Sequence, residues 1–152
     1  MAPENSCVVR RFEPQDALAV EGILRKSPEA AAWSLKSIEQ LSQRGELAWV
    51  IETDGAVHGF LVSRTVVGEA EVLNLSVDPG KRRAGNASAL LQRAVADFRG
   101  LRVTKIFLEV RESNRVAIAF YAKHGFLKTG QRPVYYRDPD EDAVLMMREL
   151  TG

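Results

Sequence analysis

Residues 73–91, which read LNLSVDPGKRRAGNASALL, decide the fold of this 152-residue chain. Apolar and polar residues alternate as far as Val77, the period-2 pattern of a half-buried strand. Residues 78–80 (Asp-Pro-Gly) end that strand, because proline cannot continue a ladder and glycine tolerates turn conformations. Asn86 is a good helix N-cap, and apolar side chains follow at helical spacing up to Phe98. The stretch therefore predicts a strand, a basic loop and a helix N-terminus.

Such a loop suits an anionic phosphate group. The first turn of a helix offers unpaired N–H donors and the positive end of the helix dipole. Gly85 and Ala87 leave the backbone open to close approach, and the cations of residues 81–83 precede them. The nucleotide P-loop is excluded, because Asn86 and Ala87 stand in its Lys and Ser/Thr places. An ordinary basic turn before a surface helix would look the same, and the residues alone leave both readings open.

A family resemblance adds to this pattern. Arg82-x-x-Gly85-x-Ala87 resembles the Gln/Arg-x-x-Gly-x-Gly/Ala signature of the GCN5-related N-acetyltransferase (GNAT) superfamily, whose loop binds the pyrophosphate of acetyl-coenzyme A. LEVRESNRVAIAFYAKHGF, at residues 108–126, resembles the second half of that family's cofactor site. The resemblance runs from about Val8 to the C-terminus, and it is closest to the branch that acetylates protein N-termini, of the ribosomal-protein-alanine type.

Composition limits the alternatives. Residues 1–152 are expected to form one domain, with ordinary globular contents of 45% hydrophobic and 27% charged residues. A net charge of +1 argues against general nucleic-acid or membrane-surface binding. Cys7 is the only cysteine, which excludes an internal disulfide and favours a cytoplasmic location. No apolar run reaches membrane-spanning length, the first residues lack a signal-peptide core, and no residue set has metal-ligand spacing.

The other patterns along the chain predict an alternation of strands and helices. Strands are expected over residues 7–12, 47–53, 56–65, 70–77, 105–110, 126–132 and 143–149. Helices are expected up to Leu24, over residues 35–44 after a Ser34 cap, over 86–99, and from the Asn114 cap to His124-Gly125. The strand–helix–strand unit around residues 86–99 implies a right-handed crossover and a locally parallel pair, while the other strands can be antiparallel.

The resemblance makes the fold class more specific. It implies an α/β (α+β) GNAT fold: a mixed, mostly antiparallel seven-stranded sheet with a splayed central parallel pair and helices on both faces. In that fold the gap between the splayed strands receives the pantetheine arm of acetyl-coenzyme A, the expected co-substrate. The implied cofactor contacts are Leu75, Val77, Arg82, Arg83, Ala84, Gly85, Asn86, Ala87, Ser88 and Asn114.

Glu109 is the candidate general base. Strand alternation places it on one face with Phe107 and Arg111, and a solvated glutamate on a polar face would fit that pattern equally well. The resemblance favours the catalytic role, because Glu109 matches the general-base glutamate of the ribosomal-protein-alanine branch. An α-amine with a pKa near ~8 is about a tenth neutral at pH 7, whereas a lysine amine near ~10.4 is neutral to under about one part in a thousand. A carboxylate, acting directly or through water, suits the α-amine better.

Tyr121 is the candidate general acid for the departing thiolate. A phenol with a pKa near ~10 stays protonated at rest and can protonate a thiolate. An aromatic ring packed on the core with its hydroxyl at the rim is the other interpretation. The match of AFYAKHGF to the family favours the acid role. A backbone N–H near Val77, where the strands splay, is expected to polarise the thioester carbonyl.

Acceptor contacts are expected from two places. Tyr135 and Tyr136, placed in the loop region before the last strand, resemble the tyrosines with which N-terminal acetyltransferases hold a peptide, although one packed and one exposed tyrosine would be ordinary. Trp33 and Ser34 resemble the family's other substrate-side wall, although Trp33 can equally cover apolar surface.

The sequence thus predicts an acetyl-coenzyme A-dependent N-acetyltransferase that acts, as a monomer or dimer, on a protein N-terminus, with a ribosomal protein as the first candidate. The nearest rival keeps the enzyme and changes the acceptor to a lysine side chain or a small-molecule amine. A rival of another class is a non-catalytic sensor of acyl-coenzyme A, which would need neither Glu109 nor Tyr121.

Overall fold

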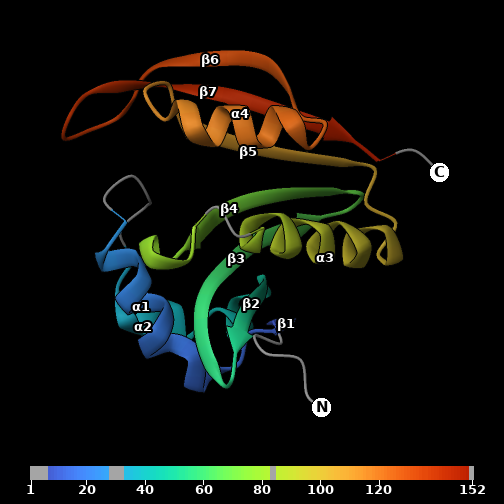
Figure 1. Cartoon of the computed structure of the whole chain (residues 1–152). Helices are drawn as coiled ribbons and strands as arrows, with labels where there is room; N and C mark the ends of the chain where they lie inside the picture. Colours follow the sequence, from blue (N-terminus) through green and yellow to red (C-terminus); the bar gives the residue numbers. More distant parts are fainter. Residues whose placement is uncertain (1–6, 28–32, 83–84, 151–152) are drawn as a thin grey trace.

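The computed structural model describes residues 7–27, 33–82 and 85–150 (Figure 1). The strands are β1 (Cys7–Arg11), β2 (Leu47–Thr53), β3 (Ala56–Val66), β4 (Glu69–Val77), β5 (Lys105–Arg111), β6 (Leu127–Tyr136) and β7 (Glu141–Glu149). The helices are α1 (Ala17–Arg25), α2 (Leu35–Glu39), α3 (Asn86–Gly100) and α4 (Arg115–Lys123), with short 3-10 turns η1 (Pro14–Asp16), η2 (Ser42–Arg44) and η3 (Pro79–Lys81).

The seven strands form one mixed sheet in the order β1-β2-β3-β4-β5-β7-β6. β4 and β5 are the parallel pair, and the other pairings are antiparallel. α3 connects β4 to β5, which confirms the predicted crossover helix. Parallel neighbouring strands need such a connection because a tight turn cannot join them. The predicted GNAT architecture is confirmed.

Helices cover the sheet on both faces and create two hydrophobic cores. Alternate residues of β2 supply the two sides: Trp49 and Ile51 face the core under α3 and α4, whereas Ala48 and Val50 face the core under α1 and α2. This explains why residues 47–51 read as a continuous apolar run instead of an alternating one. Trp49 is fully buried, packs edge-on against Phe98 of α3, and donates from its indole to Asp97 at 2.7 Å.

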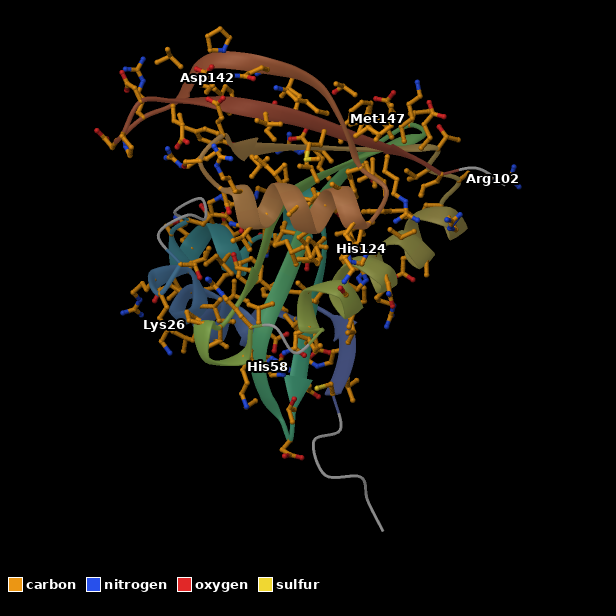
Figure 2. All side chains as sticks on the ribbon, turned by 45° about the horizontal axis from the view of Figure 1, so that its top comes forward. Lys26, His58, Arg102, His124, Asp142 and Met147 are labelled. Atoms are coloured by element: carbon orange, nitrogen blue, oxygen red, sulfur yellow. The ribbon has the colours of Figure 1, made fainter. Side chains whose placement is uncertain are left out.

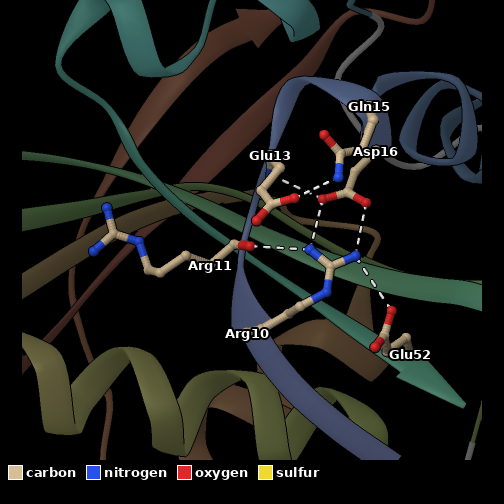
Figure 3. A network of polar contacts seen from close by, with 6 residues as sticks. All are labelled: Arg10, Arg11, Glu13, Gln15, Asp16 and Glu52. Atoms are coloured by element: carbon tan, nitrogen blue, oxygen red, sulfur yellow. Dashed lines mark hydrogen bonds and ion pairs between the residues drawn. The ribbon is translucent and has the colours of Figure 1, made fainter. Parts of the chain in front are cut away.

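A charged network ties the first strand to the first helix (Figure 3). Arg10 donates to both carboxylate oxygens of Asp16 at 2.8 Å and to Glu52 of β2 at 3.2 Å. The backbone N–H of Glu13 also donates to Asp16, at 2.8 Å. Burial by itself would raise the pKa of Asp16, but the hydrogen bonds from Arg10 and Glu13 hold that pKa below its usual value. The network therefore fixes how the chain turns from β1 into α1.

Three local predictions are wrong. The helix predicted over residues 35–44 divides into α2 and η2, and Gly45 (φ +76°) ends η2, although Ile38 and Leu41 still point into the core. Gly85 (φ +80°), not Asn86, is the N-cap of α3. Tyr135 and Tyr136 belong to β6 instead of a loop, because the strand continues past Pro133 across a register shift between Arg132 and Tyr136.

The described helices include none with both the length and the apolar character needed to cross a membrane.

Candidate functional site

The central parallel pair separates where the sequence predicts chemistry. β4 and β5 pair from Glu69↔Lys105 to Val72↔Leu108, although β4 continues to Val77 and β5 to Arg111. Figure 1 shows the two strands diverging towards the start of α3. A groove of about 1240 Å³ opens there, lined by the unpaired halves of both strands and by residues of α3, α4 and β6.

Backbone amides of β4 point into this gap. The N–H of Asp78 donates to His58 on the β3 side at 2.8 Å, and Val77 lies opposite Gly59 in the antiparallel register. Successive amides of a strand point to opposite edges, so those of Val77 and Leu75 face the side from which β5 has departed. Two N–H donors therefore line the groove where the sequence predicts a polarised carbonyl.

The N-terminus of α3 forms one end of the groove. The N–H of Ala89 makes the first helical bond, to Gly85 at 3.0 Å, so the amides of Asn86, Ala87 and Ser88 precede the intrahelical ladder. All three residues line the groove together with Gly85. The left-handed backbone of Gly85 turns the chain into the helix and leaves these amides accessible. The arrangement fits a phosphate group. Arg83 and Ala84, also predicted to bind cofactor, lie outside the described residues.

The side chains of this loop hold its shape. Arg82 donates from Nε to the carbonyl oxygen of Val77 at 3.0 Å and from Nη2 to Ser27 at 3.1 Å, which ties the loop to the end of α1. Asn86 donates to the carbonyl oxygen of Lys81 at 2.8 Å. Both residues line the groove, but these bonds show that they also brace the loop.

Two further predicted cofactor residues lie at helix ends. Ser88 is hydrogen-bonded to Nε2 of His124 at 2.9 Å, which joins the start of α3 to the end of α4; Figure 2 shows His124 at that end of α4, beside α3. Burial, followed by the charges of Lys123 and Arg148, lowers the pKa of His124. Asn114 caps α4 as predicted, accepting from the N–H of Ala117 at 3.2 Å, and lines the groove.

Glu109 lies on β5 directly after Leu108, the last residue that pairs with β4, and it lines the groove. Its Oε1 is 3.7 Å from Nη1 of Arg132. Interaction with the carboxylate of Glu109, as a hydrogen-bond acceptor and as a negative charge, raises the pKa of Tyr135. Burial, followed by the charge of Glu109, raises the pKa of Tyr136 to about 12. Both phenols therefore remain protonated donors near neutral pH.

Tyr121 enters the same groove from α4. It is buried, and its ring packs edge-on against Phe120 and Phe126 at centroid distances of 5.3 and 5.4 Å. Burial raises the pKa of Tyr121 above its ordinary value. The structure thus brings Tyr121 and Glu109 to one groove from two different elements.

Only some of the residues predicted to contact the acceptor line the groove. Trp33, Tyr135 and Tyr136 line the groove, whereas Ser34 does not. Ser34 is exposed and caps α2, accepting from the N–H of Ser37 at 3.2 Å.

Several residues that the sequence patterns did not predict also line the groove. Glu46 and Arg64 line the groove and form an ion pair at 3.7 Å. Arg132 does not line the groove but lies beside Glu109, which does. Glu71 could have been found, because it alternates with Leu73 and Leu75 on one face of β4. Glu46 carries no such signal, because the assembled sheet brings it to the groove.

Among the residues that the structure describes, no three His, Cys, Asp or Glu side chains gather in a way that could hold a metal ion.

Comparison with known proteins gives a consistent result. The acetyltransferase (GNAT) family model matches residues 17–126, which include the loop before α3, Glu109 and Tyr121. Ribosomal protein bS18-alanine N-acetyltransferase of Escherichia coli K12 is 32% identical over 125 residues, covering 81% of this chain and 84% of that protein. The crystal structure of the Escherichia coli ribosomal-protein-S18-alanine N-acetyltransferase superposes with a TM-score of 0.87 and 30% identity, covering 97% of each chain. Ard1 of Thermoplasma volcanium gives a TM-score of 0.88 and 31% identity, covering 96% of this chain and 99% of that one.

Proposed function

The chain belongs to the acetyltransferase (GNAT) family and is an N-acetyltransferase, and from that premise we propose that it acetylates the α-amine of a protein N-terminus with acetyl-coenzyme A. One observation carries the proposal: a single groove is lined by the first residues of α3, by Glu109 and Tyr121, and by the paired tyrosines of β6. The groove therefore offers a place for an anionic cofactor and a place for an amine acceptor, with acid–base groups between them.

The cofactor half of the proposal rests on the amides that precede the intrahelical bonds of α3. Those of Asn86, Ala87 and Ser88 are donors for pyrophosphate oxygens, and the dipole of α3 adds to the attraction. Leu75 and Val77 flank the gap that would take the pantetheine arm, and Asn114 lies on its opposite side. Bound acetyl-coenzyme A supplies the acetyl thioester, and the amides of Leu75 and Val77 polarise its carbonyl.

In the proposed chemical step, Glu109 and Tyr121 each carry out one proton transfer. Glu109 takes a proton from the acceptor amine, whose nitrogen bonds to the acetyl carbon as the carbon–sulfur bond breaks. Tyr121 gives a proton to the departing sulfur. Both side chains then regain their resting states by exchange with solvent, so that protons and electrons balance.

The acceptor half rests on the surroundings of Glu109. Tyr135 and Tyr136 form an edge-to-face pair at 5.1 Å, and Trp33 lines the same groove, so aromatic walls are available for the first residues of a peptide. The Escherichia coli relative is named ribosomal protein bS18-alanine N-acetyltransferase. A ribosomal protein beginning with alanine is therefore the first acceptor to test. Such an acceptor would place the reaction in the cytoplasm.

The testing experiment is an acetylation assay on a peptide panel. Peptides that differ only in their first residue, a peptide with a blocked N-terminus and an internal lysine, and free polyamines are each incubated with acetyl-coenzyme A. Mass spectrometry then locates the acetyl group. We expect acetylation of the α-amine, fastest with a small first residue such as alanine. Acetylation of the blocked peptide or of polyamines would favour the rival acceptors, and cofactor binding without turnover of any acceptor would favour a sensor.

A further inference from the structure

Arg111 of β5 contacts the part of β6 that carries the paired tyrosines. Its side chain lines the groove and is 22% exposed. Its guanidinium lies 4.6 Å from the ring centroid of Tyr136, close enough for a cation–π contact. The same group donates to Glu141 and to the carbonyl oxygens of Pro139 and Arg137, each at 3.2 Å. One side chain therefore binds both the ring of Tyr136 and the turn that follows it.

The backbone ladder is interrupted in this part of β6. The register passes from Arg132↔Ala143 to Tyr136↔Glu141, so that residues 133–135 lie opposite a single residue of β7. Such a bulge leaves residues of the longer strand out of the ladder. Contacts made by side chains therefore matter more here for the position of β6 than they do in a regular hairpin.

The two charged residues of β5 each face one of the tyrosines. Glu109 and Arg111 are two positions apart, so they point to the same face of the strand. Glu109 interacts with the phenol of Tyr135, whereas Arg111 contacts the ring of Tyr136. The two tyrosine rings pack edge to face at 5.1 Å. β5 thus supplies both the proposed base and the side chain that holds the neighbouring wall of the groove.

Arg111 is itself fixed by a carboxylate. Glu141 accepts from Arg111 through Oε1 and from the N–H of Ser113, in the turn between β5 and α4, through Oε2. The hydrogen bonds from Ser113, and after them the bond from Arg111, hold the pKa of Glu141 below its usual value. Glu141 therefore stays ionised near neutral pH. A planar guanidinium can donate in several directions and stack on a ring at the same time, which an ammonium group cannot do.

We propose that Arg111 is a positioning residue for the acceptor: it holds Tyr136 and the turn after it against the groove and thereby sets the affinity for the peptide. This inference rests on the proposed function. Arg111 acts through Tyr136 and takes no part in the proton transfers of Glu109 and Tyr121. A change at Arg111 therefore alters acceptor binding and leaves cofactor binding and the chemical step nearly unchanged.

The test is a double-variant cycle that measures KM for a peptide beginning with alanine. Arg111→Lys keeps the charge but loses the forked hydrogen bonds and the stacking. It should raise KM for the peptide by about 3–30-fold, because cation–π contacts and charged hydrogen bonds each contribute a factor of a few or more. Adding Arg111→Lys to Tyr136→Ala should change KM by less than about twofold, because the ring that Arg111 holds is then absent. In Arg111→Lys, kcat and KM for acetyl-coenzyme A should stay within about twofold of the unmodified protein.

A control variant and a second readout separate this role from a general loss of structure. Arg137→Lys makes the same substitution in the exposed turn after β6 and retains the carbonyl oxygen that accepts from Arg111, so it should leave KM unchanged. Hydrogen exchange needs no acceptor. The amides of residues 134–141 should exchange faster in Arg111→Lys, whereas those at the start of α3 should not change.

Four outcomes would overturn the inference. Additive effects of Arg111→Lys and Tyr136→Ala, or unchanged exchange in residues 134–141, would show that Arg111 does not act by holding Tyr136. An unchanged peptide KM in Arg111→Lys would contradict this inference and leave the proposed function standing. A shifted pH profile of kcat/KM would mean that Arg111 acts on Glu109 instead. An unmodified protein that acetylates no peptide would remove the proposed function, and the acceptor role of Arg111 with it.

Discussion

Tyr121 carries the proposed acid role in an environment that suppresses its ionisation. Burial raises the pKa of its phenol above the ordinary value near ~10. The side chain therefore stays protonated over the whole range in which an acetyltransferase is normally assayed. A decline in rate at moderately alkaline pH should not originate from Tyr121.

Tyr121→Phe should lower kcat by about 10²–10⁴-fold, because general acid catalysis typically contributes that much. The ring keeps its contacts with Phe120 and Phe126, so stability and KM for acetyl-coenzyme A should change little. Steady-state kinetics with varied cofactor measures both quantities. A variant that binds acetyl-coenzyme A weakly and retains kcat would make the hydroxyl a cofactor ligand instead.

Arg82 shows what a motif predicts at the scale of one residue. The signature marks a loop that leads into the N-terminus of α3. It does not show how a side chain is used, and Arg82 bonds to Val77 and Ser27 of the protein itself. Those partners are five and 55 positions away in sequence, so local spacing could not reveal the second of them.

At the scale of the elements, the loop before α3 depends on the backbone of Gly85. Its φ of +80° is a conformation that a β-branched residue rarely adopts, although a Cβ there would meet no atom within 4 Å. Gly85→Val should therefore reshape the loop and turn the amides of Asn86–Ser88 away from the groove. We expect the rise in Tm on adding acetyl-coenzyme A to disappear.

Gly68→Val is the matched control for Gly85→Val. Gly68 has the same φ of +80° and equally open space, but it lies at the other end of β4, in the turn after β3. This variant should lose stability and keep its response to the cofactor. An equal cofactor-induced rise in Tm in both variants would contradict the role assigned to the loop.

The sequence predicted most elements because their periodicity is strong, and it failed where local chemistry is ambiguous. Asparagine is a common N-cap residue. Here the side-chain amide of Asn86 donates to the carbonyl oxygen of Lys81, and Gly85 takes the N-cap position. Pro133 suggests the end of a strand, since it lacks an N–H. β6 nevertheless continues, because a register shift accommodates Pro133 and Val134 takes a φ of +47°.

At the scale of the whole molecule, the splay between β4 and β5 could not be read from periodicity. Alternation continues on both strands past the last paired residues, Val72 and Leu108, so nothing local marks where pairing stops. The family resemblance supplied this feature. The position of Glu46 in the groove likewise depends on the assembled sheet.

Stability should depend on pH through two histidines that hydrogen-bond neighbouring elements, His58, which is buried, and His124, which is half-buried. His58 bonds to Thr53 at 2.8 Å and His124 to Ser88 at 2.9 Å. Burial is the main cause that lowers the pKa of each histidine, followed by Lys81 for His58 and Lys123 for His124. The unfolded chain, where the pKa returns to about 6.5, then binds protons more readily than the folded chain. The stabilisation is full above about pH 6.5 and is lost as the pH falls below it.

Urea midpoints measured at several pH values between about 7.5 and 5.5 test this dependence. The midpoint should fall with pH, and the double variant His58→Gln/His124→Gln should show a flatter profile. Asp16, whose pKa is held low, contributes only at more acidic pH. An unchanged slope in the double variant would assign the dependence to other groups.

The most direct test of the account concerns Glu109 as the base for an α-amine. The measurement is kcat/KM for a peptide beginning with alanine, in the unmodified protein and in Glu109→Gln, at about pH 7 and about pH 9. Glutamine keeps an acceptor for Tyr135 but cannot take a proton. The account predicts a large loss at about pH 7 and partial recovery at about pH 9, where most of an amine with a pKa near ~8 is already neutral. An equal loss at both pH values would contradict it and leave Glu109 a binding or structural residue.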